Sequence, residues 1–176
     1  DDISLVVAHL GSGCSITAVE NGRSKWTSMG FTPLEGVMMA TRSGSVDPGV
    51  LIHIVQTGRA GVEEVADALE QRSGLLGVSE VSADIRDVRK AAQAGNERAA
   101  LALQMFAARA AEGGAAAMTW VVPDAIVFTG GIGEHDAEMR AEILGRVRVA
   151  PDIPVLTIEA REDLVMAAAT LTLVGP

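Results

Sequence analysis

The chain opens with three short segments whose pattern of hydrophobic residues is typical of β-strands. Residues 3–9 are mostly apolar, include several β-branched side chains and are followed by glycines, so they predict a buried strand. Segments 14–20 and 25–29 predict two more strands. Between them, Asn21-Gly22 favours a tight type I′ hairpin, because both turn positions need a positive φ. We therefore expect an antiparallel three-strand meander at the start of the chain.

Helical periodicity dominates the middle of the chain. Four helices are expected, at 49–56, 62–71, 85–94 and 96–118. Asp47-Pro48 is a start signal for the first helix, and Asn96 caps the last one. Gly113-Gly114 lies inside that alanine-rich helix, where it either bends the helix or permits close packing.

The last third of the chain alternates strands and helices. We expect an apolar strand at 125–128, a glycine turn at 130–133, a helix from about 136 to 147, a short strand at 155–158 and a helix at 161–173, whose end could instead be extended. The whole order predicts an α/β fold in which helices cover a mixed sheet. A length of 176 residues with 48% apolar residues fits one domain with a real core. The chain starts without methionine and almost directly in an apolar run, so we expect a fragment.

Charge and composition narrow the class of partner. A net charge of −9 and an aromatic content of only 3% disfavour nucleic acid, because a phosphate backbone would be repelled and bases would find few rings. A nucleotide is not excluded, since backbone N–H groups and a metal ion can hold phosphates. The one cysteine, Cys14, cannot form an internal disulfide, and the longest apolar stretch, 115–128, is too short to span a bilayer. We expect a soluble cytoplasmic protein with no membrane segment.

Three glycine-containing segments are the candidates for chemistry. Segment 9–13 joins the first two expected strands and could line an anion site, although spacing alone slightly favours a plain hairpin loop. Segment 130–133 lies between a strand and a helix, which suits a nucleotide, but it lacks the P-loop ending and the full Rossmann spacing. Segment 41–44 carries Arg42, which could stabilise a transferring phosphoryl group; taken alone, a surface arginine is the simpler interpretation.

The histidines and sulfur-containing residues offer weaker signals. The three histidines lack the spacing of a metal cluster. His53 is expected to be packed among its apolar neighbours, whereas His9, at the end of a strand, is the better functional candidate. Buried Cys14 would behave as a small hydrophobe, and Met38-Met39 are expected to pack in the core or at a partner surface.

Taken in order, several segments resemble the acetokinase family of acetate, propionate and butyrate kinases. The densest match is 29–48, which reads Met-Gly-Phe-Thr-Pro-Leu-Glu-Gly-Val-Met-Met-Ala-Thr-Arg-Ser-Gly-Ser-Val-Asp-Pro and is close to a family signature. Segments 9–13, 73–79, 84–86 and 128–134 also look like family blocks. The resemblance covers nearly the whole chain, but only the C-terminal half of a family member.

The resemblance implies a fold and a set of functional residues. The fold is one domain of the kind shared by acetate and sugar kinases, the heat-shock chaperone ATPase and actin (ribonuclease H-like), and residues 1–176 would be the C-terminal nucleotide-binding domain. Arg42 would stabilise the transition state, and Glu162 would bind a metal ion. The nucleotide would be held by His9, Leu10, Gly11, Ser12 and Gly13 at the phosphates, by Asp84, Ile85 and Arg86 at the adenosine, and by Gly131, Ile132, Gly133, Glu134 and His135 at the adenine and ribose.

The implied reaction is reversible phosphoryl transfer between ATP and acetate, which gives ADP and acetyl phosphate with Mg²⁺ or Mn²⁺ as cofactor. The resemblance also implies a homodimer paired through this half. Apolar residues from Met38-Met39 through His53, and small ones such as Ala107, Ala108, Ala110 and Ala111, could serve that interface or pack within one subunit. The family's other half supplies a metal-binding asparagine, a carboxylate-binding arginine and a catalytic aspartate, so this half alone is expected to be inactive.

The chain departs from the family pattern at several positions. Ser12 and His135 stand where asparagine is usual, and the shorter Ser12 side chain would lie near the phosphates. Ser45, Ala40 and Ala168 replace an acidic or amide residue, a glycine and an arginine. Two alternatives remain open: a non-catalytic nucleotide-binding or dimerisation module, and a propionate or butyrate kinase. Segment 29–48 argues against a sugar kinase.

Overall fold

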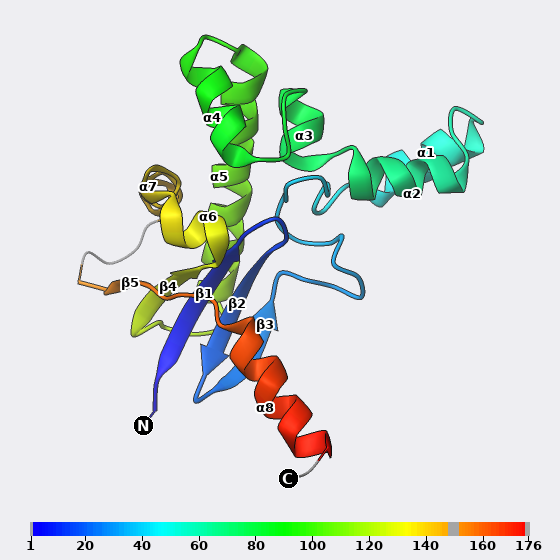
Figure 1. The fold of residues 1–176 in the computed structure, drawn as a ribbon. Helices are drawn as coiled ribbons and strands as arrows, with labels where there is room; N and C mark the ends of the chain where they lie inside the picture. The colour runs from blue at the N-terminus through cyan, green and yellow to red at the C-terminus, as the bar shows by residue number, and fades with distance from the viewer. Residues whose placement is uncertain (1, 148–151, 175–176) are drawn as a thin grey trace.

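A five-stranded mixed sheet forms the centre of the molecule (Figure 1). In the computed structural model, which describes residues 2–147 and 152–174, the strand order is β3-β2-β1-β4-β5. The strands are β1 (Ser4–Leu10), β2 (Cys14–Glu20), β3 (Arg23–Thr27), β4 (Ala125–Thr129) and β5 (Val155–Thr157). β1, β2 and β3 pair antiparallel, whereas β4 runs parallel to β1 and β5 runs parallel to β4. The predicted α/β fold, with a three-strand meander inside a mixed sheet, is confirmed.

The meander forms as the sequence predicts because its signals are local. Asn21 and Gly22 have φ angles of 52° and 71°, both positive as a type I′ turn requires. Side chains on one face of β1 are buried and their neighbours are only half-buried, which follows the two-residue period of a strand. The third strand begins two residues earlier than predicted, at Arg23, because the two-residue turn pairs Arg23 directly with Glu20.

Helices fill the connections between the strands. They are α1 (Pro48–Gln56), α2 (Val62–Gln71), α3 (Gly74–Ser79), α4 (Ile85–Gln93), α5 (Glu97–Met118), α6 (Gly130–His135), α7 (Ala137–Arg146) and α8 (Glu162–Val174). The four helices predicted in the middle of the chain are confirmed, and so is the helical alternative at the C-terminal end. The short helix α3 was not predicted. Its first N–H groups are hydrogen-bonded to residues that are distant in the sequence. The Leu75 N–H donates to the Met39 carbonyl at 2.9 Å, and the Leu76 N–H donates to the Ala40 carbonyl at 3.0 Å.

The prediction of a glycine turn at 130–133 was wrong, because these residues form helix α6. Glycine disfavours a helix interior, so the local sequence signals a turn. In the structure, the Glu134 carboxylate accepts a hydrogen bond from the Gly130 N–H at 2.9 Å and so satisfies one of the free donors at the helix start. This contact stabilises a helical conformation that the glycines alone would not favour.

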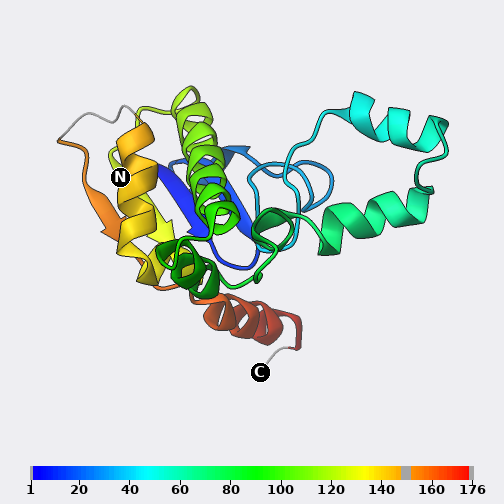
Figure 2. The ribbon, with the colours of Figure 1, turned by 90° about the horizontal axis from the view of Figure 1, so that it is seen from above.

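The core lies between the sheet and the long helix α5, which packs against β1 and β2 on one face of the sheet (Figure 2). A Cβ placed on Gly113 would lie only 2.9 Å from Ile16 Cγ1 and 3.2 Å from Val37 Cγ1. Gly113 therefore allows helix and sheet to approach closely, which is the second of its two predicted roles.

Helices α1 and α2 form an arm that projects away from the body (Figures 1 and 2). Neither helix buries a residue, and His53 is exposed, so the prediction that His53 is packed is wrong for this chain. Apolar side chains at Val50, Ile52 and Val55 are 48%, 56% and 39% exposed. Helical periodicity predicted α1 correctly. It could not show that the apolar side chains of this helix would remain exposed. No helix among the described residues combines the length and apolar character needed to cross a membrane.

Two groups proposed for a subunit interface pack inside this chain instead. Met38 and Met39 are 3% and 0% exposed and belong to the core, which confirms the first of the two predicted roles. Ala107, Ala110 and Ala111 of α5 are also buried, at 0%, 2% and 5%. These residues therefore give no support to a dimer, because the sheet and neighbouring helices already cover them.

Candidate functional site

Two glycine segments far apart in the sequence meet at one edge of the sheet. Loop 11–13 follows β1, and α6 follows β4, which runs parallel beside β1, so both begin where these strands end. A Cβ on Gly11 would lie 3.9 Å from the amide nitrogen of Gly131. Main-chain groups of the two segments are therefore exposed side by side, and this surface, made by loop 11–13 and the start of α6, is called here the glycine floor. Such an arrangement can bind an anion.

Gly130 allows this close approach. It has a φ of +78°, and a Cβ there would lie 2.8 Å from the Leu10 carbonyl oxygen and 3.1 Å from His9 Cε1. Only glycine fits both the left-handed backbone and the space. The Glu134 carboxylate that accepts from the Gly130 N–H also accepts from the Ala160 N–H at 2.9 Å, and so fixes the segment that leads into α8.

The loop that carries Arg42 lies beside the glycine floor. The Ala40 N–H donates to the Ser12 carbonyl at 3.2 Å, which fastens the loop to segment 11–13. Arg42 is half-buried, and its Nη1 lies 3.9 Å from Met39 Sδ and 3.7 Å from the position of a Cβ on Gly13. The structure therefore brings the arginine and the first glycine loop together, although 29 positions separate residues 13 and 42 in the sequence.

The floor separates two neighbouring cavities. The first, called here the α4 cavity, has a volume of about 1090 Å³ and is lined by Gly11, Ser12, Ala40, Ala83, Asp84, Ile85, Arg86, Arg89, Lys90, Gln93, Gly131, Ile132, His135, Asp136, Ala137 and Glu138. The second, the α8 cavity, measures about 750 Å³ and is lined by His9, Gly11, Ser12, Gly13, Cys14, Met29, Gly130, Gly131, Glu134, Glu159, Ala160, Glu162 and Asp163. Gly11, Ser12 and Gly131 line both, so one ligand can extend across the glycine floor from one cavity into the other.

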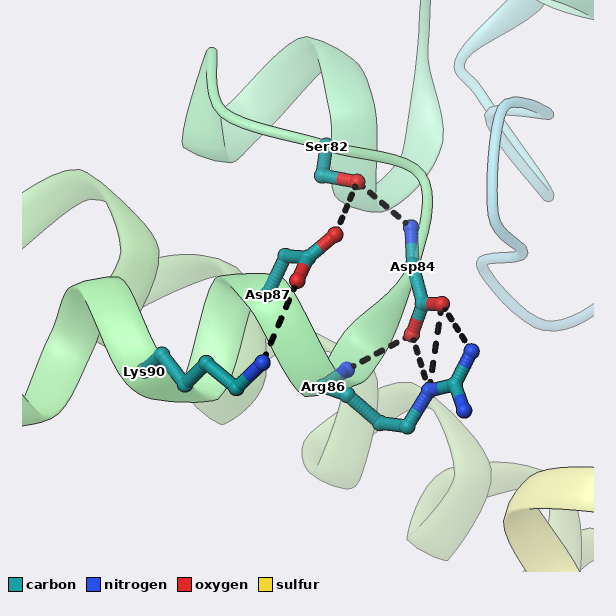
Figure 3. Close-up of polar contacts among 5 residues, drawn as sticks. All are labelled: Ser82, Asp84, Arg86, Asp87 and Lys90. Carbon is teal, nitrogen blue, oxygen red and sulfur yellow. Dashed lines mark hydrogen bonds and ion pairs between the residues drawn. The ribbon is translucent and has the colours of Figure 1, made fainter.

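An ion pair between Asp84 and Arg86 marks the start of α4 (Figure 3), and both residues line the α4 cavity. Asp84 caps the helix by accepting from the Arg86 N–H at 2.9 Å, and the Arg86 Nε donates to both carboxylate oxygens at 2.9 and 3.1 Å. The side-chain hydrogen bonds from Arg86 lower the pKa of Asp84 to about 2, and the same contact raises the pKa of Arg86. Asp84 therefore carries its negative charge throughout the physiological pH range.

Most of the predicted site residues line one of the two cavities, but Arg42, Leu10 and Gly133 line neither. Leu10 is 0% exposed and Ile85 is 7% exposed, so their side chains belong to the core, although Ile85 also contributes to the lining of the α4 cavity. Gly133 is buried against β1 and β4, where a Cβ would lie 3.5 Å from the Ala8 carbonyl oxygen. Any contact of Leu10 or Gly133 with a ligand would have to be through the main chain.

Sequence reasoning missed several lining residues. On the α4 side these are Arg89, Lys90, Gln93 and Asp136, and on the α8 side Met29, Glu159 and Asp163. Helical spacing from Arg86 would have found Arg89, Lys90 and Gln93, since residues three, four and seven positions apart share a helix face. Nothing in the sequence indicated that Asp136 lies opposite them.

The α8 cavity offers carboxylates that fit a divalent cation. Among the described residues, no three His, Cys, Asp or Glu side chains are grouped closely enough to hold a metal ion by themselves. Glu134 already accepts two main-chain hydrogen bonds and Asp163 pairs with Arg161 at 3.0 Å, so Glu159 and Glu162 are better placed as ligands. Mg²⁺ commonly takes one or two carboxylates and completes its shell with water and phosphate oxygens. The donor set therefore fits a metal that binds together with a phosphate.

Cys14 lies beneath the α8 cavity and is fully buried. Burial raises the pKa of its thiol from 9.0 to about 12. The thiol donates a hydrogen bond to the Gly11 carbonyl oxygen at 3.4 Å. We expect a thiol-specific reagent at pH 8 to modify the folded protein at least about a hundredfold more slowly than the unfolded protein, because the thiolate is the reactive form. Equal rates would contradict the buried placement.

The same shift predicts a pH dependence of stability. Because the folded-state pKa is raised, the stability gained by keeping Cys14 neutral is fully present below pH 9 and is lost as the pH rises from 9 towards about 12. Unfolding midpoints measured between pH 8 and about pH 11 should therefore fall more steeply for the natural protein than for Cys14→Ala, which has no thiol to ionise. Parallel curves would contradict this expectation.

The fold and the site together define the class of protein. A three-strand meander in a mixed sheet, with glycine segments after adjacent parallel strands, is the architecture of the acetate and sugar kinase, heat-shock chaperone and actin domains. The ROK hexokinase from Thermus thermophilus shares this fold, with a TM-score of 0.53 at 17% identity over 89% of this chain and 52% of its own.

The chain belongs to the acetokinase family, whose sequence model matches residues 1–159. It is 52% identical to an acetate kinase of Nostoc punctiforme over 137 residues, which cover 77% of this chain and 34% of that protein. The crystal structure of Porphyromonas gingivalis acetate kinase matches with a TM-score of 0.89 at 33% identity, over 99% of this chain and 50% of its own. A propionate kinase from Francisella tularensis matches with a TM-score of 0.88 at 36% identity, over 95% of this chain and 48% of its own. The chain thus spans about a third to a half of the length of the curated relatives it matches.

Proposed function

We propose that this chain is the C-terminal, nucleotide-binding half of an acetate kinase, which transfers a phosphoryl group reversibly between ATP and acetate. The observation that carries the proposal is the position of Arg42 beside Gly13, next to the glycine floor whose residues Gly11, Ser12 and Gly131 line both cavities. Phosphoryl transfer needs positioning and charge neutralisation more than covalent help from the protein, and the floor supplies both kinds of group.

The nucleotide would lie across the floor. Its adenosine fits the α4 cavity, between the Asp84–Arg86 pair on one side and Gly131, Ile132 and His135 on the other. Its phosphates would pass over Gly11, Ser12 and Gly131, which are the residues common to both cavities. Glycine at two of these positions keeps side chains away, so that phosphate oxygens can approach the backbone N–H groups.

Arg42 and the α8 cavity would then act on the terminal phosphate. The half-buried Arg42 guanidinium is held beside Gly13, where a planar cation can share the charge on the equatorial oxygens of the phosphoryl group in flight. Glu162, with Glu159 beside it in the cavity lining, would hold Mg²⁺ or Mn²⁺. When bound, the metal ion neutralises negative charge on the phosphate oxygens.

Several finer features of the full-length kinase belong to the same proposal. The carboxylate-binding and remaining catalytic groups would come from the other half, so this half alone would be inactive. Acetate is the proposed substrate, with propionate and butyrate as close alternatives, because the acyl pocket would be shared with that other half. A role as a nucleotide-binding module without catalysis is the second candidate, and the chain's share of its relatives' length is the observation in its favour. We propose a cytoplasmic location.

Gly131 gives a clean test of nucleotide binding. A Cβ on this exposed residue meets nothing within 4 Å, so Gly131→Ala adds a methyl group that only a ligand on the floor would contact. In titration calorimetry with ATP and Mg²⁺, we expect the natural chain to bind with a Kd below about 1 mM. Gly131→Ala should weaken binding at least about tenfold at an unchanged unfolding midpoint.

Gly145→Ala is the matched control, since Gly145 is also exposed and helical, has no atom within 4 Å of its Cβ position and lines neither cavity. It should bind nucleotide as the natural chain does. Absence of any heat from the natural chain at millimolar nucleotide would contradict nucleotide binding, and equal affinity of Gly131→Ala would remove the phosphates from this floor.

We propose that the full-length kinase is a homodimer in which the exposed apolar residues of α1 contribute to the interface. Val50, Ile52 and Val55 present uncovered apolar surface on the arm, and apolar surface of this kind is stabilised when a partner covers it. Light scattering should give twice the monomer mass, and Ile52→Lys should shift the mass towards the monomer. A monomer mass for the natural protein that is unchanged on concentration would contradict the proposal.

A further inference from the structure

A half-buried arginine joins the two walls of the α4 cavity. Arg89 of α4 places its Nη2 2.8 Å from Asp136 Oδ2 and its Nη1 3.0 Å from Glu138 Oε1, with Glu142 Oε1 at 3.9 Å. The side chains of Arg89 and Asp136 are only 16% and 15% exposed, unlike the more exposed partners of the other ion pairs that the structure describes. One guanidinium is thus surrounded by carboxylates from the opposite wall.

Asp136 sits at the joint between α6 and α7. Its Oδ1 accepts from the Met139 N–H at 2.8 Å and caps α7, while its own N–H donates to the Ile132 carbonyl at the end of α6. Arg140 strengthens the joint by donating from Nη1 to the carbonyls of Gly133 and Glu134, both at 2.9 Å. A displacement of Asp136 would therefore carry with it the α6 segment that contains Gly131 and His135.

The two walls rest separately on the same support. α4 packs against α5 on one side of the cavity, and α7 packs against α5 on the other. The Arg89–Asp136 pair connects these walls directly, at a sequence separation of 47 residues. Its length limits how far α4 and the α6–α7 joint can separate.

We infer that Arg89 is a positioning residue that sets the width of the α4 cavity through Asp136 and thereby sets the affinity for the nucleoside part of the nucleotide. The inference rests on the proposed function, because the ligand of this cavity is taken to be the adenosine of ATP or ADP. Arg89 itself is not assigned a contact with the reacting phosphoryl group, which would lie on the far side of the glycine floor. Loss of the pair should therefore affect nucleotide binding and leave the chemical step nearly unchanged.

Two single substitutions each disrupt the Arg89–Asp136 ion pair, one by changing Arg89 and the other by changing Asp136. Arg89→Met keeps most of the aliphatic length but removes the charge. Asp136→Asn removes the opposite charge and keeps an oxygen that can cap α7, because asparagine is as good an N-cap as aspartate. Asp136→Asn therefore remains a folded test if Arg89→Met is unstable. Arg98→Met is the control, since it removes an exposed pair with Glu80 at 3.1 Å, outside the α4 cavity.

The measurements are calorimetric Kd values for ADP and steady-state kinetics in the full-length kinase. Each single substitution should raise the Kd and the KM for nucleotide about tenfold, with kcat within about threefold and the KM for acetate unchanged. The double variant should bind about as weakly as Arg89→Met alone, because Arg89→Met already removes the contact that Asp136→Asn disrupts. Arg98→Met should match the natural enzyme.

Each other outcome overturns the inference. Unchanged nucleotide affinity in either folded single variant, or losses that multiply in the double variant, would mean that the pair does not act as one positioning device. An equal fall in kcat with no change in nucleotide KM would assign Arg89 to the chemical step instead. If the natural enzyme binds nucleotide and the variants do as well, the inference alone fails. If the natural enzyme binds no nucleotide, the inference and the proposed function fail together.

Discussion

Replacing Arg42 with alanine in the full-length kinase is expected to lower kcat about a thousandfold or more, with a much smaller change in the KM for ATP. The reason is geometric, because the guanidinium stands beside Gly13, at the edge of the floor over which the phosphates would pass. Under the proposed function, its charge would matter most when negative charge is spread over the transferring phosphoryl group. Initial rates of acetyl phosphate formation at saturating ATP give the measurement.

Two further variants of this experiment make the result specific. Arg42→Lys should recover only part of the lost rate, because lysine keeps the charge but lacks the planar pair of donors. Arg23→Ala is the control, since Arg23 is exposed and follows the hairpin turn at the opposite end of β2 from the glycine loop. A kcat close to that of the natural enzyme in Arg42→Ala would remove Arg42 from the mechanism.

The second large effect is expected at Gly44, two residues after Arg42. Gly44 is buried with a φ of +70°, and a Cβ there would lie 2.6 Å from the Gly36 carbonyl oxygen and less than 3 Å from Val37 and Met38 backbone atoms. These are main-chain atoms, so they cannot move aside as a side chain could. Gly44→Ala should therefore distort the loop that holds Arg42.

Comparison with Gly58→Ala separates the effect of this steric clash from the cost of placing alanine in a left-handed backbone conformation. Gly58 also has a positive φ, +66°, but nothing lies within 4 Å of its Cβ position. It should lose about 1 kcal/mol of stability, the cost of a left-handed alanine. Gly44→Ala should lose about 2 kcal/mol more, as overpacked sites do, and should also lower kcat. Denaturant midpoints and rates measured side by side would decide, and similar losses in the two variants would contradict the role given to Gly44.

The short-range features of this protein followed from its sequence. The alternation in β1 and β2, the Asn21-Gly22 turn and the caps Asp47 and Asn96 each depend on residues within a few positions of one another. Their physical causes are local, namely backbone sterics and the hydrogen bonds of a helix's first turn. The meander and the four central helices were predicted on this basis, whereas the mixed sheet was predicted from the order of strands and helices along the chain. The family blocks, including Arg42 and the glycine segments, were visible in the sequence as well.

The features that the sequence did not predict depend on contacts between residues that lie far apart in the sequence. Helix α6 forms where glycines signalled a turn because the Glu134 carboxylate satisfies its first donor, and α3 begins on carbonyls of Met39 and Ala40. The exposure of His53 also had no local signal, since a helix shows which of its faces is apolar but not whether the chain covers that face.

The sequence by itself determined the family, most of the strands and helices, and the candidate residues for nucleotide binding. Only the tertiary structure decided how those residues are grouped. Pairing of β1 with β4 brings Gly11 to Gly131, the Ala40–Ser12 hydrogen bond brings Arg42 to the same floor, and Arg89 reaches Asp136 from 47 residues away. Such groupings come from packing on a shared sheet and a shared helix, α5, and packing joins residues without regard to their distance along the chain.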